Sequence, residues 1–352
     1  MIGSLIKYSA IAAKIKSMEG KMLSIADYEM LMRKHSVAEV ASCLKDKAEY
    51  HDLLREVNES TVHRDELELF LRASLIADFA KLYRFAHADV RQFLSLFFVN
   101  FEINVLKQIA RSINTGQVFS ERLNAFVQEH VSYPVHVLSG AASLPALIQA
   151  LRNSRFEKPL QHLLKSRETV TIFDFEMTLD IYNYQLLSAC VQKSLKGVEK
   201  KQMLELIGSE ADMLNLMWIY RSRVKLELPP ELVYSYIIPI YHHVRQTDIL
   251  KMANAKSADE LLGLLQQTRY GALFTGKDLE IGYLRFFQTL CMRMLRSNPY
   301  SLASIQCYMW LKEIEFRNII SIIESIRYGL EPEEMQEYLI LPAHREVKQY
   351  GN

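Results

Sequence analysis

The chain has 352 residues and a mass of 40.9 kDa, which exceeds the usual size of a single hydrophobic core, so two or three structural units are expected. Its 42 basic and 41 acidic side chains nearly balance, which argues against nucleic acid as a partner, because binding to phosphates needs a basic surplus. Glycine (12) and proline (9) are scarce, whereas turn-rich β-sandwiches and glycine-looped nucleotide folds use both freely. Together with many strong helix formers, this composition predicts an all-α protein with more than about 60% helix.

The first 22 residues are basic and amphipathic and lack the apolar core and cleavage site of a signal peptide, so they are predicted to form a helix. No uninterrupted apolar run reaches the roughly 18 residues of a membrane span. The longest candidate, Phe93 to Phe101, contains Ser95 and Asn100 and is followed by Glu102. We therefore predict no transmembrane segment.

Three segments, at Ser36, Ser143 and Ser257, align on a serine that begins an amphipathic helix. In each, an aliphatic residue follows four positions on and a leucine eight on, which places both on one helix face. An aromatic residue follows at 14, 13 and 13 positions. These residues are Val40, Leu44 and Tyr50; Leu147, Leu151 and Phe156; and Leu261, Leu265 and Tyr270.

The first and third of these segments carry the S-x-x-E capping box, with Glu39 and Glu260 at its last position. In such a box the glutamate side chain accepts a hydrogen bond from the amide of the serine. Ser143 has no glutamate at this position. The features of a helix start that remain there are the serine N-cap and Pro145 in the first turn.

A second shared element lies about 65 residues beyond each serine, where an acidic residue precedes an asparagine that is predicted to open an apolar helix. Between the two elements, each copy has a long amphipathic helix. The acidic and asparagine pairs are Glu102 with Asn104, Asp212 with Asn215, and Glu315 with Asn318. The intervening helices contain Leu67-Glu68, Phe175-Glu176 and Leu279-Glu280.

The serines are 107 and 114 residues apart, far more than the repeat of a stacked helical solenoid, so each copy is predicted to be a multi-helix bundle. We expect three bundles, at residues 1–115, 116–228 and 229–352. Closure around a pseudo-threefold axis is favoured, because it removes the two exposed ends that a linear array must cap. The three asparagines would then occupy equivalent positions.

Gly271 to Asp278 comes one residue short of a phosphate-binding loop, with two glycines and Lys277 in place but no hydroxyl for Mg²⁺. Asp278 stands at the hydroxyl position and would repel phosphate, and the preceding residues have helical spacing. We predict that the chain neither binds nor hydrolyses nucleotide. A nucleotide-dependent enzyme that uses Lys277 is an alternative.

Three further patterns are not expected to carry chemistry. His63-Arg64-Asp65 is similar to a kinase catalytic loop but lacks its partner asparagine. The neighbouring His242 and His243 would point about 100° apart on a helix, and no carboxylate cluster accompanies them in the sequence. The four cysteines form no C-x-x-C pair, which predicts reduced and mostly buried thiols. They are Cys43, Cys190, Cys291 and Cys307. We therefore predict no catalytic, cofactor-binding or metal-binding residues.

Several longer segments resemble one known family over essentially the whole chain. These segments are AKIKSMEGKML at 13–23 with Asp27-Tyr28, NLMWIYR at 215–221 with Leu228-Pro-Pro-Glu231, Asn298-Pro-Tyr-Ser301, YMWLKEIEFRNII at 308–320, and Ile326-Arg-Tyr-Gly-Leu330 with Pro332-Glu-Glu. The family that they resemble is the C subunit of V-type and archaeal-type rotary ATPases, called the d subunit in eukaryotes.

This resemblance implies a funnel of three similar helical subdomains and a non-catalytic part of a rotor. Such a part couples the central shaft subunits (D and F type) to the membrane proteolipid ring for ion transport. The resemblance further implies a monomer within a hetero-complex, without cofactor, cytoplasmic and held peripherally on the cytoplasmic face of the membrane by the ring. The alternative class is a generic all-α scaffold that binds helical partners along one continuous concave stripe.

Overall fold

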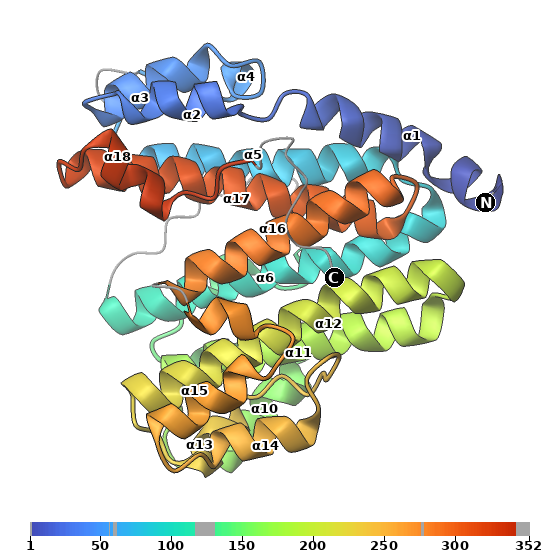
Figure 1. The fold of residues 1–352 in the computed structure, drawn as a ribbon, viewed down its shortest axis with the longest axis vertical. Coiled ribbons are helices and arrows are strands. Elements are labelled where there is room, and N and C mark those ends of the chain that lie inside the picture. Colours follow the sequence, from blue (N-terminus) through green and yellow to red (C-terminus); the bar gives the residue numbers. More distant parts are fainter. Residues whose placement is uncertain (1, 56, 59–61, 117–130, 276–277, 343–352) are drawn as a thin grey trace. The chain divides into compact units, whose positions relative to one another are not determined.

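The computed structural model describes residues 2–55, 57–58, 62–116, 131–275 and 278–342 (Figure 1). Helices account for 75% of it, and the described residues contain no strand. The all-α prediction is therefore confirmed. The chain divides into two compact units, residues 1–87 with 278–352, here called the terminal unit, and residues 88–277, here called the central unit. The division into three bundles and the closed threefold arrangement stay predictions.

The terminal unit combines both ends of the chain in one core. The long helix α17 packs against α5, α16 and α1 and also contacts the short helices α2 and α3. Figure 1 shows α17 running alongside α5. The elements of this unit are α1 (Ile2–Glu19), α2 (Ile25–Met32), α3 (Val37–Lys45), α4 (His51–Leu54), α5 (Arg64–Phe85), α16 (Leu279–Ser297), α17 (Leu302–Arg327), α18 (Pro332–Met335) and the 3₁₀ turn η3 (Gln336–Tyr338).

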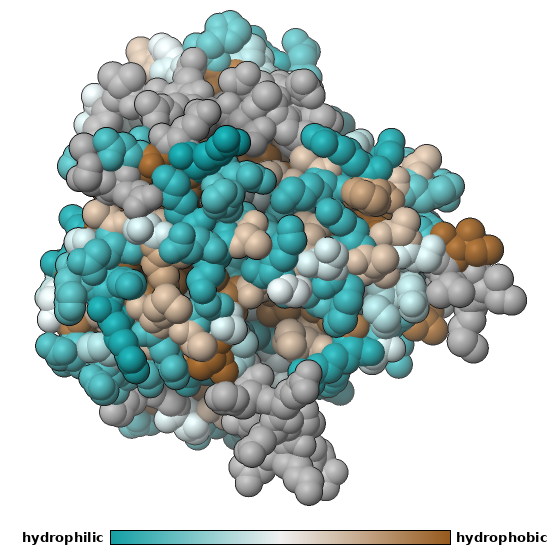
Figure 2. All heavy atoms as spheres, turned by 90° about the horizontal axis from the view of Figure 1, so that it is seen from above, coloured by the Kyte–Doolittle hydropathy of each residue, from teal (hydrophilic) through white to brown (hydrophobic). Residues whose placement is uncertain are grey.

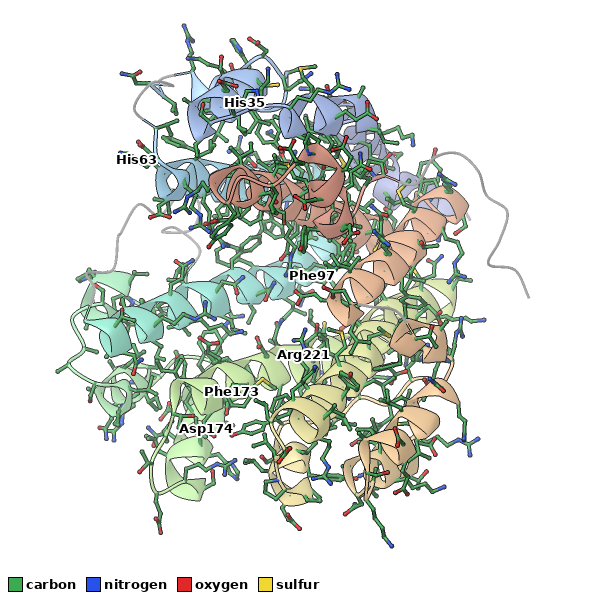
Figure 3. All side chains as sticks on the ribbon, turned by 60° about the vertical axis from the view of Figure 1, so that its left-hand side comes forward. His35, His63, Phe97, Phe173, Asp174 and Arg221 are labelled. Atoms are coloured by element: carbon green, nitrogen blue, oxygen red, sulfur yellow. The ribbon has the colours of Figure 1, made fainter. Side chains whose placement is uncertain are left out.

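The central unit is built around α11, which packs against α6, α10 and α12. Figure 3 labels Phe173 and Asp174 at the beginning of α11 and Arg221 directly after α12; the centre of the Phe173 ring lies 5.3 Å from that of Trp218, near the end of α12. The elements are α6 (Ala88–Thr115), α8 (Val135–Leu138), α9 (Leu144–Ala150), α10 (Glu157–Ser166), α11 (Ile172–Ser194), α12 (Gly197–Tyr220), the π-helical turn η1 (Arg221–Lys225), α13 (Pro230–Ser235), α14 (Gln246–Ala253), α15 (Ala258–Gln266) and the 3₁₀ turn η2 (Gly271–Thr275).

All three predicted serine caps are confirmed. Each serine hydroxyl accepts a hydrogen bond from the amide three residues on, at 3.2 Å for Ser36, 3.3 Å for Ser143 and 3.1 Å for Ser257. The aliphatic, leucine and aromatic positions that follow are all at most 1% exposed. The 3.6-residue period of the sequence therefore identified the buried face of α3, α9 and α15.

The capping boxes differ from the prediction in their glutamates. Glu39 accepts from the amide of His35 at 3.0 Å, and Glu260 accepts from the amide of Lys256 at 2.8 Å. Each amide belongs to the residue before the serine. The carboxylate therefore satisfies a donor just outside the helix, and each helix start is fixed from both sides.

Helix α6 bears on the prediction that the chain has no transmembrane segment. It is long and apolar enough to cross a membrane by length and composition, with a mean hydropathy of 1.3 over its best window. Its apolar run is interrupted by Asn100 and Glu102, which a mean over 18 residues tolerates. Within the structure, 61% of that window is buried, as in the core helix of a folded domain.

The hydropathy of the surface can be followed on one face of the molecule. On the face drawn in Figure 2, hydrophilic and hydrophobic side chains are interspersed.

The two tryptophans of the chain fall in different units, with Trp218 in α12 and Trp310 in α17. Their fluorescence therefore reports on the central and the terminal unit separately.

Candidate functional site

The three acidic residues of the sequence repeat form one recurring buried site. Glu102 is 0% exposed, and Asp212 and Glu315 are each 1% exposed. Each accepts main-chain hydrogen bonds from a segment that leads into a serine helix. Glu102 accepts from the amide of Ser132 at 2.7 Å, and Glu315 accepts from that of Leu23 at 2.6 Å. We call these three residues the anchoring carboxylates.

Asp212 makes the most extensive set of these contacts. Its two oxygens accept from three successive amides, at 3.1 Å from His242, 2.6 Å from His243 and 3.2 Å from Val244. Burial raises the pKa of Asp212, although these hydrogen bonds act in the opposite direction. The segment before α14 is thereby fixed to α12.

In the first and third serine segments the aromatic residue completes the site. The Tyr50 hydroxyl donates to Glu315 at 2.6 Å, and the Tyr270 hydroxyl donates to Asp212 at 3.2 Å. In the sequence repeat, each acidic residue belongs to the same copy as the serine that precedes it. In the structure, Glu102 and Asp212 instead bind the segment that belongs to the next serine along the chain. Glu315, in the last long helix, binds the first serine segment. Sequence spacing could not reveal this pairing, since its partners lie 265 residues apart.

In the second copy the aromatic residue is Phe156, which has no hydroxyl to donate. Among the described residues, Glu102 Oε2 has no hydrogen-bond donor, and the nearest cation is Arg155, whose Nε lies 3.5 Å away. The second anchoring carboxylate is therefore less completely satisfied than the other two.

Replacing Phe156 by Tyr should supply the missing donor and raise the free energy of unfolding of the central unit by about 1 kcal/mol, the usual net value of a buried hydrogen bond. Urea unfolding followed by Trp218 fluorescence in a Trp310→Phe background measures this change. In a Glu102→Gln background the gain should shrink, because the charged acceptor is gone. An equal effect in both backgrounds, or a loss of stability, would contradict the assignment.

Glu315 also lies beside a buried cation. Lys312, whose side chain is 1% exposed, places its Nζ 2.6 Å from Glu315 and 4.8 Å from the centre of the Tyr50 ring. Glu49 lies 3.8 Å from the same Nζ, and burial raises the pKa of Glu49 despite this cation. Burial and the charge of Glu315 together raise the pKa of Tyr50. The cluster is therefore one buried, hydrogen-bonded charge network.

The asparagines that were predicted to open helices lie inside helices instead. The Asn215 side chain donates a hydrogen bond to the carbonyl of Ile238, 23 residues further on, at 2.9 Å and accepts one from its amide at 2.8 Å. The Asn318 side chain makes the same pair of hydrogen bonds with Ile340, 22 residues further on, both at 2.9 Å. Asn104 is exposed, and the segment at the same distance beyond it lies outside the described residues. Asparagine favours helix starts in isolation, but here long-range backbone contacts decide its place.

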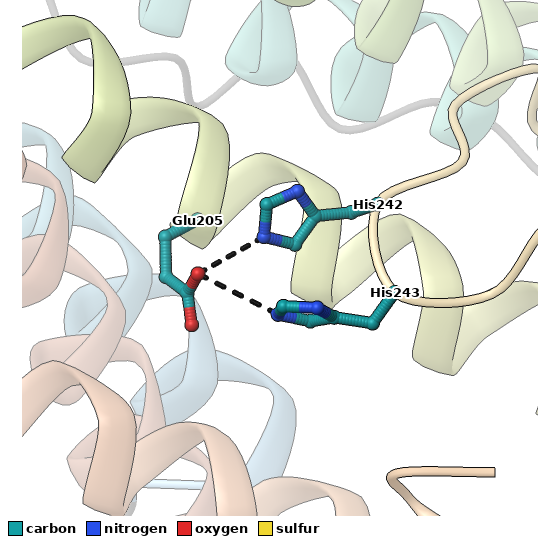
Figure 4. A group of neighbouring side chains, drawn as sticks. All are labelled: Glu205, His242 and His243. Carbon is teal, nitrogen blue, oxygen red and sulfur yellow. Dashed lines mark hydrogen bonds and ion pairs between the residues drawn. The ribbon is translucent and has the colours of Figure 1, made fainter.

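Glu205, His242 and His243 form a second candidate site, against the prediction that the two histidines cannot share a metal ion. The two histidines lie in the non-helical segment between α13 and α14, so the 100° separation expected on a helix does not apply. Their Nε2 atoms lie 2.9 and 3.5 Å from Oε2 of Glu205 on α12 (Figure 4). Two imidazoles and a carboxylate thus share one small volume, an arrangement that could hold a metal ion.

The backbone of α12 makes room for this cluster. A Cβ added at Gly208 would lie 2.6 Å from Cβ and Cγ of His242, so the ring packs on the helix only because residue 208 has no side chain. Burial acts to raise the pKa of Glu205, but the hydrogen bond with His242 and the charges of both histidines together lower it. Burial, His242 and Arg269 lower the pKa of His243.

Replacing Gly208 by Ala should lower the free energy of unfolding of the central unit by about 1–2 kcal/mol, because the clash with His242 outweighs the gain in helix propensity. Gly263→Ala in α15 is the matched control, since nothing lies within 4 Å of its added Cβ. That variant should gain about 0.5–1 kcal/mol. Urea unfolding of both variants checks the difference. Equal gains would show that His242 does not occupy this position.

The remaining motifs have structural roles. Gly271–Thr275 is a 3₁₀ turn that follows α15 and no strand, whereas Gly276 and Lys277 lie outside the described residues. Asp278 caps α16 by accepting from the amides of Glu280 and Ile281 at 2.8 and 3.1 Å. This geometry differs from a phosphate-binding loop, which needs free amides after a strand.

Neither of the other two patterns forms the arrangement that its motif would need in the described residues. His63 precedes α5, and Arg64 forms ion pairs with Asp65 at 2.8 Å and Glu324 at 2.6 Å. The four cysteines are free thiols, three of them buried and Cys190 partly exposed, as predicted.

A family model and several curated proteins match this chain over most of its length, and their descriptions agree. The family model described as ATP synthase (C/AC39) subunit matches residues 11–338. The chain is 24% identical over 342 residues to the C subunit of the A-type ATP synthase of Thermococcus kodakarensis, covering 94% of this chain and 90% of that protein. The protein of the same description from Methanocaldococcus jannaschii is 22% identical over 355 residues, covering 97% and 88%. That from Haloferax volcanii is 22% identical over 346 residues, covering 94% and 97%.

Proposed function

We propose a function from the premise that this chain belongs to the family of ATP synthase (C/AC39) subunits. As a subunit of a rotary ATPase, it would act as a non-catalytic adapter between the central shaft and the membrane proteolipid ring. Its partners would be D- and F-type shaft subunits on one side and the ring on the other. The match to the family, which extends over nearly the whole chain, is the observation that carries this proposal.

The anchoring carboxylates support a mechanical role. Glu102, Asp212 and Glu315 each fix a connecting segment to the middle of a long helix through buried hydrogen bonds. Charge-assisted hydrogen bonds of this kind resist displacement, and packed helical cores have low compressibility. A part that passes torque from a shaft to a ring needs this stiffness, because deformation inside the part would dissipate the motion.

The surface supports contact with protein partners at short range. With a net charge of +1, the chain has little long-range steering, so local complementarity would hold the interfaces. Polar and apolar side chains are interspersed on the face in Figure 2. We propose mixed interfaces of at least about 1,000 Å² each, on which added salt weakens the polar rim more than the apolar centre.

The membrane association follows from the same premise. Since α6 is largely buried in the structure, we propose that the chain reaches the membrane through the ring and lies peripherally on its cytoplasmic face. In a flotation assay, the purified chain should remain with the soluble fraction when mixed with plain vesicles. It should float with vesicles that contain the proteolipid ring.

The decisive experiment reconstitutes the catalytic head, shaft and membrane sector in vesicles with and without this chain. Without it, ATP hydrolysis by the head should persist while ATP-driven ion transport is lost, and adding the purified chain back should restore transport in proportion to the amount bound. Transport that persists without the chain would contradict the adapter role. Binding of the chain to unrelated helical peptides, without any effect on transport, would favour a general helical scaffold.

A further inference from the structure

We propose that Glu205, His242 and His243 bind a divalent transition-metal ion, and that Zn²⁺ fits their donor set best. Two imidazole nitrogens and one carboxylate oxygen are ligands that Zn²⁺ takes readily, whereas Mg²⁺ and Ca²⁺ prefer oxygen ligands only. The three donor atoms lie within 4.8 Å of one another.

The distances suit a tetrahedral ion. With metal–ligand bonds of about 2.0–2.1 Å, two ligand atoms of a tetrahedral Zn²⁺ lie roughly 3.3 Å apart. The Nε2 atoms of His242 and His243 are 2.9 and 3.5 Å from Glu205 Oε2, so small side-chain rotations bring all three around one ion. Three protein ligands leave a fourth position for water or another ligand.

The surrounding structure holds these ligands in place. Asp212 lies seven residues after Glu205 and therefore on the same face of α12. Because Asp212 binds the amides of both histidines, the loop is fixed to the helix before any ion arrives. Gly208 lets the His242 ring approach the helix backbone. Such support of the ligands by neighbouring groups is typical of metal sites.

The site is accessible from solvent, and one protein cation already lies at its edge. The ligand side chains are 23–26% exposed, which leaves an entry path. Arg269 places Nη1 2.9 Å from His243 Nε2 and Nη2 3.9 Å from Glu205 Oε1. A metal ion would displace the arginine from His243, so the affinity for metal should rise when the arginine is removed.

The test uses the full chain after treatment with a chelator, titrated with Zn²⁺ by calorimetry and with Co²⁺ by visible absorption. We expect one equivalent of Zn²⁺ to bind and Co²⁺ to give the intense absorption of a four-coordinate site. His242→Gln, His243→Gln and Glu205→Gln should each weaken binding at least about tenfold. Arg269→Ala should strengthen it about tenfold, as removal of a cation a few ångströms away predicts in a solvated site.

Matched controls separate this site from other ligands in the chain. His162→Gln replaces an exposed histidine on α10, and Cys190→Ser replaces the partly exposed thiol. Both variants should bind Zn²⁺ as the wild type does, and circular dichroism should show that every variant remains folded. No saturable binding, or binding unchanged in His242→Gln and His243→Gln, would overturn the proposal. Since the isolated chain is used, this outcome is independent of the adapter function.

Discussion

Replacement of Glu315 by Ala is expected to lower the free energy of unfolding of the terminal unit by about 3–5 kcal/mol, because it leaves a buried cation with only the more distant carboxylate of Glu49, at 3.8 Å. Lys312 is 1% exposed, and its Nζ lies 2.6 Å from Glu315. The amide of Leu23 and the hydroxyl of Tyr50 lose their acceptor at the same time. Urea unfolding followed by Trp310 fluorescence in a Trp218→Phe background measures the effect.

Two further variants make this prediction specific. Glu313→Ala removes an acidic residue from the same helix whose side chain is 48% exposed, and it should change stability by less than about 0.5 kcal/mol. The double replacement Glu315→Leu with Lys312→Met should recover part of the loss, because it removes the buried cation along with its carboxylate. The Leu23 amide and the Tyr50 hydroxyl still lack their acceptor, and among the described residues Glu49 keeps only Lys81, at 4.0 Å, as a neighbouring cation. If Glu315→Ala costs no more than Glu313→Ala, the carboxylate does not anchor the N-terminal segment.

Gly271→Ala is expected to lower the free energy of unfolding of the central unit by about 3 kcal/mol, the upper end of the cost of overpacking. An added Cβ would lie 2.0 Å from the carbonyl oxygen of Gln266 and 2.6 Å from its carbonyl carbon. Both are backbone atoms at the end of α15, so no side-chain rotation relieves the clash. The turn would open and draw Tyr270 away from Asp212.

The control for this variant is Gly140→Ala, whose added Cβ would meet a single backbone atom at an ordinary 3.7 Å. It should change stability by less than about 0.5 kcal/mol. Trp218 fluorescence in a Trp310→Phe background reports both variants. A Gly271→Ala chain as stable as the control would show that the turn after α15 differs from the one described.

Local features of this fold could be predicted from the sequence, since they depend on neighbours along the chain. The cap at Ser257 and the buried positions Leu261 and Leu265 follow from side-chain chemistry and helical periodicity within nine residues. The same reasoning failed at Asn215, where a preference for helix starts gave way to two hydrogen bonds with a distant backbone segment.

The candidate metal site could not be predicted, because its members come together only through tertiary contacts. A helix at His242 and His243 would have kept their side chains apart. The structure places them instead in an irregular segment whose amides are bound by Asp212, 30 residues earlier. Glu205 carries no motif of its own, so nothing in the sequence linked it to the histidines. The only local trace is Gly208, a glycine in the interior of a long helix.

The hydrogen bond between Leu23 and Glu315 spans 292 residues, which fixes an order of events during synthesis. At about 5–20 residues per second, a ribosome needs roughly 15–60 s to move from one partner to the other. Throughout that interval the apolar faces of α2, α3 and α5 lack α17, against which they pack. The central unit lies between Leu23 and Glu315 in the sequence, so it can complete its own core before α17 is synthesised. A nascent chain of this protein thus carries an unfinished N-terminal segment beside a finished unit, and a chaperone that binds apolar helices has its substrate there.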